Sequence, residues 1–270
     1  MGLSESGGYQ EITDFLVDGV DDYTIEDYDG WRELTALIPS NDSEVVIVIS
    51  YTVKLNRNAE PWDGEDLDEY VLPQQYVDSD NAEIIKLGEQ LRGTDDYETA
   101  QNILSYVYKT IKARSETLVN ATQLTASELL ETPVGVCADK AILMTALLRA
   151  DGIPARKISG LVLSVPLKKV VDWSHPGGSH AWVEFYADGE WHFADPTWNI
   201  FDKSDTTHLS YGTYETSMNS DFLQNRYNEI KKAGFFLNGS MSAPLRFTVY
   251  STDENAMVIP RADATFSWFR

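Results

Sequence analysis

The stretch Gly135–Ala141 reads GVCADKA and contains the only cysteine of the 270-residue chain, Cys137. It opens an apolar run in which Ala, Ile, Leu and Met fill most positions from Ala138 to Leu148. A helix of this composition has no wide polar face, so we expect it to be buried on most sides. Gly152 and Pro154 predict its end, because glycine adopts the left-handed conformation at helix ends and proline cannot continue a helix.

Cys137 lies in the first turn of this predicted helix. There the unpaired backbone N–H groups and the positive end of the helix dipole favour an anion, so they lower the pKa of a thiol. The same N–H groups can receive a developing oxyanion. The alternative is a small apolar core residue, because free cysteines are among the most buried side chains. A nucleophile also needs a base, so the choice depends on a suitably placed histidine.

The composition is that of a globular protein. Hydrophobic residues make up 43% of the chain and aromatic residues 11%, and the length allows one large domain, or one domain with an extension. There is no apolar run of about 18 residues, so we expect no membrane insertion. A single cysteine allows no internal disulfide and no cysteine cluster for zinc. The opening MGLSESGG lacks the basic start and apolar centre of a signal peptide.

Acidic residues are concentrated in the front part of the chain. The formal net charge is −22, and residues 1–100 contain 25 Asp+Glu and 5 Lys+Arg, a balance of −20. The remaining 18 acidic and 16 basic residues leave −2 for residues 101–270. Such a field repels nucleic acid and anionic lipid, so we expect neither as a partner. The acidic part is either a solvated face or a patch that attracts cationic substrates or cell-surface material.

Composition also predicts a seam between an N-terminal extension and the main body. Residues 1–30 mix acidic and aromatic residues without a sustained period, so we expect an arm or a loosely ordered lead-in. Glu44–Leu55 contains a β-branched run that predicts a strand, and residues 56–79 form an acidic, proline-containing connector. We therefore expect an acidic extension with one strong strand over 1–78, and the main domain over 79–270.

Helical and strand patterns follow in the main domain. Thr125 and Glu128 predict a short capped helix that delivers the chain to the cysteine stretch. Apolar periodicity predicts the other elements. Helices are expected over Ala82–Leu91, Tyr97–Ile111 and Asp221–Ala233, and strands over Ala155–Val165, Leu245–Tyr250 and Thr265–Phe269.

The stretch Ser179–Tyr186 alternates strictly between two faces. Its odd-numbered positions from 181 are apolar, whereas His180 and Trp182 face the other way. Asp188-Gly189 is a two-residue hairpin signal, and Glu190–Asp195 returns as a second strand. We therefore predict a β-hairpin.

The register of this hairpin brings a histidine and a carboxylate together. With Asp188-Gly189 as the loop, Asp195 lies opposite Trp182. His180 lies two positions from Trp182 on the same face, so it becomes the diagonal neighbour of Asp195, within reach of a side-chain hydrogen bond. A carboxylate on one imidazole nitrogen fixes the tautomer and leaves the other nitrogen for a thiol, as Cys-His-Asp nucleophilic catalysis requires.

The other three histidines fit this role less well. His192 falls on the opposite face of the hairpin, where a hydrogen-bonded core histidine is expected. His175 and His208 lie in predicted loops, where we expect them to be solvated. His180 is therefore the candidate base.

Four motifs together resemble the transglutaminase-like superfamily of papain-type thiol enzymes, in its prokaryotic form. The resemblance covers about residues 80–200 and implies Cys137 as nucleophile, His180 as general base and acid, and Asp195 as the group that orients His180. It also implies an α+β fold in which the buried cysteine helix packs on an antiparallel sheet. The motifs are GVCADKA at Gly135–Ala141, LRADGIPAR at Leu148–Arg156, HAWVE at His180–Glu184 and DPTW at Asp195–Trp198.

The resemblance further implies a second oxyanion donor upstream, beside the backbone N–H of Cys137. Gln123 and Tyr108 are candidates, and neither is preferred. Asp139 and Lys140 are expected at the surface or behind the site rather than as acid or base.

The predicted reaction is attack of the Cys137 thiolate on an amide carbonyl of a protein or peptide, which gives a thioester. Hydrolysis of that thioester, as in a cysteine peptidase or amidase, is the preferred hypothesis. Transfer to a lysine amine would instead make the protein a cross-linking protein-glutamine transglutaminase. A non-catalytic binding or scaffold module on the same fold is the third hypothesis.

We expect no metal, cofactor or nucleotide, because the chain has neither a glycine-rich phosphate loop nor the acidic spacing of a calcium loop. A location outside the cell or in the cell envelope is expected, with the cytoplasm as the alternative.

Overall fold

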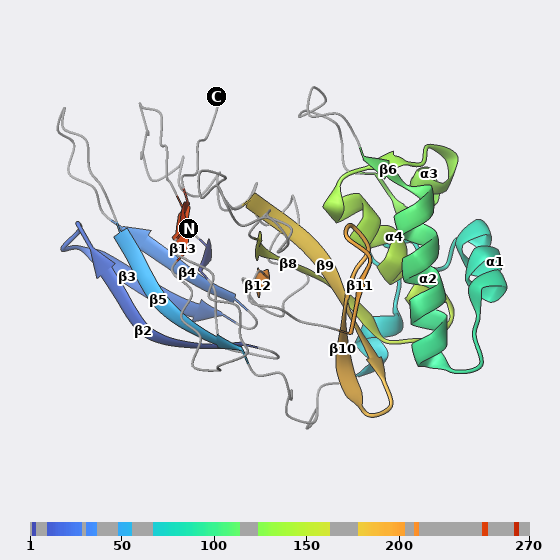
Figure 1. Cartoon of the computed structure of the whole chain (residues 1–270), viewed down its shortest axis with the longest axis horizontal. Coiled ribbons are helices and arrows are strands. Elements are labelled where there is room, and N and C mark those ends of the chain that lie inside the picture. The colour runs from blue at the N-terminus through green and yellow to red at the C-terminus, as the bar shows by residue number, and fades with distance from the viewer. Residues whose placement is uncertain are drawn as a thin grey trace.

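The helices and the N-terminal strands lie at opposite ends of the molecule, with a central sheet between them (Figure 1). No helix in the described part of the chain is both long enough and apolar enough to cross a membrane. The computed structural model describes residues 2–3, 10–28, 31–36, 48–55, 67–113, 124–162, 178–202, 208–210, 245–247 and 262–264.

Within the described residues, each helix precedes or contains the cysteine stretch. They are the 3-10 helix η1 (Leu67–Val71) and the α-helices α1 (Ala82–Leu91), α2 (Asp96–Thr110), α3 (Ala126–Glu131) and α4 (Cys137–Ala150). The strands are β1 (Gly2–Leu3), β2 (Gln10–Asp18), β3 (Tyr23–Tyr28), β4 (Trp31–Ala36), β5 (Val48–Leu55), β6 (Lys112–Ala113), β7 (Val134–Gly135), β8 (Ala155–Val162), β9 (Gly178–Ala187), β10 (Glu190–Asp195), β11 (Ile200–Phe201), β12 (His208–Ser210), β13 (Leu245–Phe247) and β14 (Ala262–Ala264).

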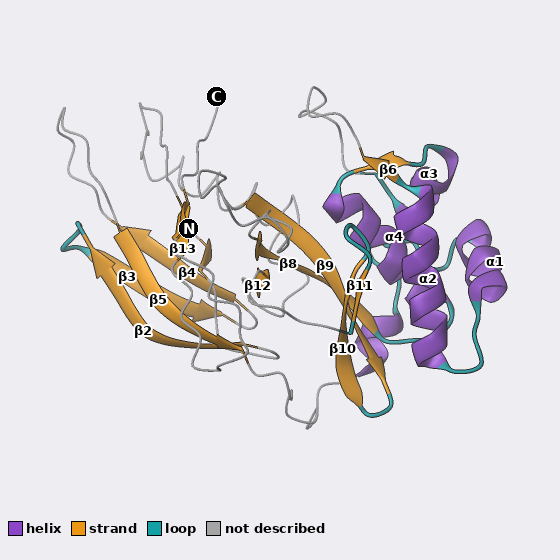
Figure 2. Ribbon diagram, in the orientation of Figure 1, coloured by secondary structure: helices purple, strands orange, loops and turns teal. Residues whose placement is uncertain are grey.

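Helix α4 is the central element of the core, as its composition predicts. Every residue from Ala141 to Arg149 is buried, because α1, α2 and α3 pack on it from one side and β8 and β9 from the other (Figure 2). Gly152 has φ 79° and its N–H donates to the carbonyl of Arg149 at 3.0 Å. The predicted left-handed helix end is therefore confirmed.

Side-chain caps define the starts of the other three α-helices. Asn81 accepts a hydrogen bond from the N–H of Glu83 at the start of α1, and Asp95 accepts one from the N–H of Glu98 at the start of α2. At α3, Thr125 and Glu128 form the predicted reciprocal capping box, at 2.8 and 3.2 Å. The helices predicted over Ala82–Leu91 and Tyr97–Ile111 are confirmed, the second beginning and ending one residue earlier.

The central sheet is antiparallel throughout and has the order β11-β10-β9-β8-β12. Its β9–β10 hairpin has the predicted register, with Glu190 opposite Ala187. Asp188 and Gly189 have φ values of 52° and 91°, which the tight two-residue turn requires. The buried cysteine helix thus packs on an antiparallel sheet in an α+β fold, as expected.

The two faces of β9 have different neighbours. Val183 and Phe185 belong to the large core that contains α4. Trp182, on the opposite face, packs with Ile158 of β8 and Phe193 of β10. This alternation follows from the period of two in the sequence.

The N-terminal region contains more strands than predicted. Residues 1–30 were expected to form a loosely ordered lead-in, and this prediction is wrong for β2 and β3. The pairing of β2 with β5 shifts by one residue between Thr13 and Leu16, and Asp14 has φ 53°. Such a bulge moves the following side chains to the other face, so a period of two cannot be followed across it.

Several predictions lie wholly or partly outside the described residues. The strand expected over Glu44–Leu55 is seen from Val48, and that expected over Leu245–Tyr250 is seen as β13, paired with β14. The division of the chain into 1–78 and 79–270 stays a prediction. The parts outside the described residues are 44–47, 56–66, 163–165, 221–233, 248–250 and 265–269, together with Gln123 and His175.

Candidate active site

Cys137 is the first residue of α4, and its neighbours fix the entry of the chain into the helix. A Cβ atom on Gly135 would lie 2.7 Å from Cβ of Asp139, so no larger residue fits there without movement. The carboxylate of Asp139 accepts a hydrogen bond from the N–H of Val136 at 2.8 Å. This contact caps the first turn of α4 and so holds the half-buried thiol of Cys137 in place.

Asp139 and Lys140 were expected either at the surface or behind the site. The surface position is wrong, because both side chains are buried. Asp139 is 2% exposed and Lys140 is 7% exposed. Burial lowers the pKa of Lys140, although the negative charges of Asp195 and Cys137 act in the opposite direction. Lys140 is therefore a buried cation close enough to the site to feel its charges.

His180 of β9 and Asp195 of β10 are hydrogen-bonded, with Nε2 of His180 3.0 Å from Oδ2 of Asp195. Both side chains are buried, and Asp195 has no exposed surface. The other oxygen of Asp195 accepts the backbone N–H of Thr197 at 2.7 Å. The diagonal contact predicted from the hairpin register is therefore present in the fold.

The thiol of Cys137 and the imidazole of His180 lie close enough for each to shift the pKa of the other. Since Nε2 of His180 faces Asp195, Nδ1 is the nitrogen left for the sulfur. The imidazole therefore bridges the thiol and the carboxylate, although the three side chains come from three different elements.

The pKa values of the thiol and the imidazole move in opposite directions. Burial raises the pKa of Cys137, but the hydrogen bond and charge of His180, and the N–H groups of Ala181 and Ala138, outweigh it and lower the pKa. Burial lowers the pKa of His180, but Asp195 and Cys137 outweigh it and raise the pKa to about 9. These shifts favour a thiolate–imidazolium pair, the reactive form of a thiol nucleophile.

Trp198 covers the imidazole. Its ring stacks on that of His180, with centroids 4.5 Å apart and planes 16° from parallel, and 40% of the residue remains exposed. The indole therefore shields one face of the His180 imidazole from water and also presents an apolar surface beside that ring.

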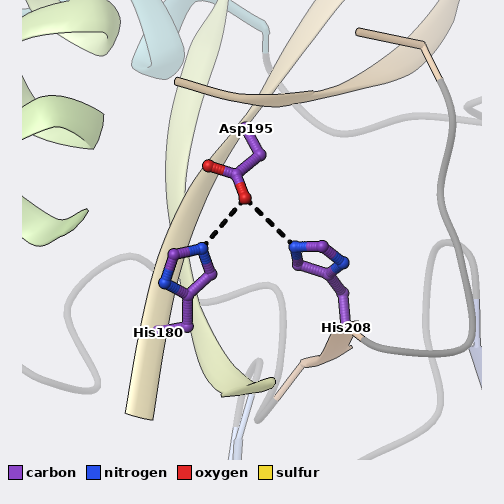
Figure 3. Close-up of side chains that lie close together, drawn as sticks. All are labelled: His180, Asp195 and His208. Atoms are coloured by element: carbon purple, nitrogen blue, oxygen red, sulfur yellow. Dashed lines mark hydrogen bonds and ion pairs between the residues drawn. The ribbon is translucent and has the colours of Figure 1, made fainter. Parts of the chain in front are cut away.

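His208 was expected in a loop and in solvent, and both expectations are wrong. It is the first residue of β12 and is 3% exposed. Its Nε2 lies 3.2 Å from Oδ2 of Asp195, the oxygen that His180 also contacts (Figure 3). A three-residue strand is too short for a periodic signal, so the sequence did not identify His208 as part of the site.

His192 is the hydrogen-bonded core histidine that the sequence predicts. Nδ1 lies 3.0 Å from Oδ1 of Asp202, and Nε2 lies 3.1 Å from the carbonyl of Ala187. Its ring stacks on Phe185, on the helix-facing side of the hairpin. It is therefore directed away from the Asp195 face.

Among the described residues, His180, Asp195 and His208 are also the group with the geometry to hold a metal ion, since one ligand atom from each lies within 4.8 Å of the others. A metal would need a lone pair on both Nε2 atoms, whereas the hydrogen bonds to Asp195 need protons there. The hydrogen-bonded arrangement and a bound metal therefore exclude each other.

Of the two candidates for a second oxyanion donor, Tyr108 lies within the described residues. It is 44% exposed on α2, and its ring centroid is 5.7 Å from Nζ of Lys140. Tyr108 therefore lies beside Lys140, which follows Cys137 by about one turn of α4. The contact does not distinguish Tyr108 from Gln123 as the oxyanion donor.

The sequence over residues 85–196 matches the family described as the transglutaminase-like superfamily, in its core domain. This range includes Cys137, His180 and Asp195. Residues 85–196 of the chain therefore match the core of the transglutaminase-like superfamily, the family predicted from the motifs.

The fold is similar to that of a candidate cysteine protease from Cytophaga hutchinsonii, with a TM-score of 0.56 at 21% identity over 81% of this chain and 77% of that one. The periplasmic domain of TgpA from Pseudomonas aeruginosa matches with a TM-score of 0.39 at 18% identity, over 73% of each chain. An uncharacterised protein of Mycobacterium leprae is 43% identical over 63 residues, which are 23% of this chain and 22% of the relative. The aligned part thus spans about a fifth of that relative's length.

Proposed function

We propose that the protein is a thiol enzyme that hydrolyses amide bonds of proteins or peptides through a thioester on Cys137. The observation that carries this proposal is the position of His180, which is hydrogen-bonded to the buried carboxylate of Asp195 and also lies close enough to Cys137 to lower the pKa of its thiol. A histidine with a purely structural role would not need both contacts.

The proposed reaction follows from the charges of this pair. The thiolate of Cys137 attacks the amide carbonyl carbon and forms a C–S bond, while the backbone N–H of Cys137 donates to the oxyanion. The C–N bond then breaks as His180 gives its proton to the departing amine. Water attacks the thioester carbonyl, His180 takes a proton from that water, and the acid leaves as Cys137 is released.

The surroundings of the thiol suit a peptide substrate. Val134, Val136 and Trp198 are 37%, 46% and 40% exposed, and they lie next to the thiol in sequence or against the imidazole. Exposed apolar side chains around a reactive group can bind apolar side chains of a substrate. We therefore propose a substrate with apolar residues flanking the cleaved amide, carried by a protein of the cell surface or envelope, where we also propose that this enzyme is located.

The test is to incubate the wild type with peptides that contain glutamine and apolar residues, in the presence of a labelled primary amine, and to analyse the products by mass spectrometry. Hydrolysis that disappears in Cys137→Ala and persists in the surface variant Lys86→Ala is the expected result. Dominant amine incorporation would identify the cross-linking alternative. No product, together with alkylation of Cys137 by iodoacetamide no faster than that of free cysteine, would support the non-catalytic module.

A further inference from the structure

The imidazole of His208 approaches the site from the strand farthest from β10 in the central sheet. Strand β12 pairs with β8 at the sheet edge, with His208 opposite Val162. From there the side chain reaches Asp195, two strands beyond β8. Figure 3 shows the two imidazoles on either side of a single carboxylate oxygen.

The hydrogen bonds determine the tautomers of both rings. Asp195 accepts contacts from Nε2 of His180 at 3.0 Å and from Nε2 of His208 at 3.2 Å, both on Oδ2. A carboxylate can only accept, so each Nε2 must carry a proton. The other oxygen of Asp195, Oδ1, accepts a hydrogen bond from the backbone N–H of Thr197 at 2.7 Å. Both carboxylate oxygens are therefore hydrogen-bonded, and the carboxylate cannot rotate without losing one of these bonds.

The surroundings of His208 fix its ring in this direction. Trp182, Phe193 and Trp198 meet it nearly edge to face, at centroid distances of 5.2, 5.0 and 5.4 Å. These rings supply no charge that could replace the carboxylate as the partner of Nε2. The packing therefore supports the hydrogen bond geometrically and keeps water from Asp195.

We propose that His208 is a positioning residue of this site: its Nε2–H fixes the Asp195 carboxylate, and Asp195 in turn holds His180 with Nδ1 toward Cys137. This proposal rests on the proposed function, since it concerns the same nucleophile and base. His208 acts through Asp195.

Two variants of His208 separate positioning from packing. His208→Gln keeps a neutral N–H donor at about the reach of Nε2 but loses the ring, whereas His208→Phe keeps an aromatic ring but loses the donor. The readout is the rate constant for alkylation of Cys137 by iodoacetamide at pH 6.5, which reports the thiolate and requires no substrate. The folded state of each variant is checked by thermal unfolding.

We expect His208→Phe to reduce the alkylation rate about tenfold, the order expected from the loss of one hydrogen bond to a charged group, and His208→Gln to reduce it less than about threefold. Wild-type rates in both folded variants, or a slower rate in Gln than in Phe, would overturn the proposal. If His208→Phe does not fold, the proposal can still be tested on the wild-type protein, because NMR of ¹⁵N-labelled histidine reports which ring nitrogen of His208 is protonated. A protonated Nε2 on His208 supports the proposal, and a neutral Nδ1–H tautomer overturns it.

These measurements are independent of the proposed reaction. If Cys137 is alkylated rapidly and the variants behave as expected but no peptide is cleaved, the hydrolytic function fails and the role of His208 stands. If peptides are cleaved and both variants retain the wild-type alkylation rate, the hydrolytic function stands and the role of His208 fails.

Discussion

Helix α4 and the N-terminal strands differ in how much apolar surface they bury. Around α4, side chains from α1 to α3 and from β8 to β10 form one continuous buried cluster. In the N-terminal region, Val17 and Leu34 are the buried hydrophobic residues among those described, and Phe15, Val20 and Ile25 pack against them in part. Most of the other described side chains there are polar or exposed.

This difference indicates that the largest buried core and the candidate active site lie in the same part of the molecule. A buried helix supplies a rigid platform for a thiol at its first residue, because close-packed interiors resist displacement. The N-terminal strands depend more on backbone hydrogen bonds and on polar contacts with the rest of the chain. One such contact is visible, since the side chain of Gln10 forms two hydrogen bonds with the backbone of Ser210, at 2.8 and 2.9 Å.

The largest effect that tests this comparison is on stability. Leu147→Ala removes a fully buried side chain from α4 and should lower the free energy of unfolding by about 2–5 kcal/mol. Leu16→Ala in β2 removes a side chain that is 60% exposed and should change the free energy of unfolding by less than about 0.5 kcal/mol. Urea denaturation measures both. Equal losses in the two variants would show that the N-terminal strands contribute to stability as strongly as the core does.

The second prediction concerns the entry into α4. Gly135→Ala forces a Cβ against Asp139 and should cost about 1–3 kcal/mol, as overpacking does, and it should slow the alkylation of Cys137 because the cap of the first turn is displaced. Gly88→Ala in α1 is the matched control. The nearest atom to its added Cβ would be 3.4 Å away, so this variant should be neutral or slightly more stable. Identical behaviour of the two variants would remove the argument for a tight helix start.

The third prediction is the pH dependence of the chemistry held by the core. His180 must be protonated to give a proton to the leaving amine, and its pKa is raised to about 9. The value of kcat/KM for an amide substrate should therefore fall about tenfold per pH unit as the pH rises above about 9. As the pH falls, activity should persist below the ordinary thiol pKa, because the pKa of Cys137 is lowered. A falling limb centred near pH 6.5 would instead indicate a histidine not held by Asp195.

The smallest effect is expected where the two regions meet. Gln10→Ala removes both hydrogen bonds to Ser210 and should lower the free energy of unfolding by about 1 kcal/mol. Hydrogen exchange of the Ser210 amide should become faster, because its acceptor is lost. Leu16→Ala, on the same strand, should leave this exchange unchanged. An unchanged rate in Gln10→Ala would mean that the N-terminal strand does not hold β12.

The sequence could predict elements whose geometry is set by nearby residues. The register of the β9–β10 hairpin followed from Asp188-Gly189, because a two-residue turn with positive φ values fixes the pairing of both strands. The contact between His180 and Asp195 then followed from the period of two. In the same way, the composition after Cys137 and the glycine at residue 152 predicted α4 and its end.

Other features depended on contacts between distant parts of the chain. His208 joins Asp195 because β12 pairs with β8, and the paired residue Val162 lies 46 positions earlier, which no local pattern encodes. The strand β2 was missed because the bulge at Asp14 interrupts its alternation. The burial of Lys140 was missed because a charged residue in the first turn of a helix is usually exposed.

The sequence by itself determined where the helix begins, which residue carries the thiol, and which histidine and carboxylate share a face, because these follow from turn geometry and from the periods of helix and strand. Only the tertiary structure decided that the thiol lies close to that histidine, that a second imidazole binds the same carboxylate, and that the carboxylate and both imidazoles are buried while the thiol is half-buried. The physical reason is that burial and side-chain contact depend on the packing of separate elements, whereas register and capping depend on residues a few positions apart.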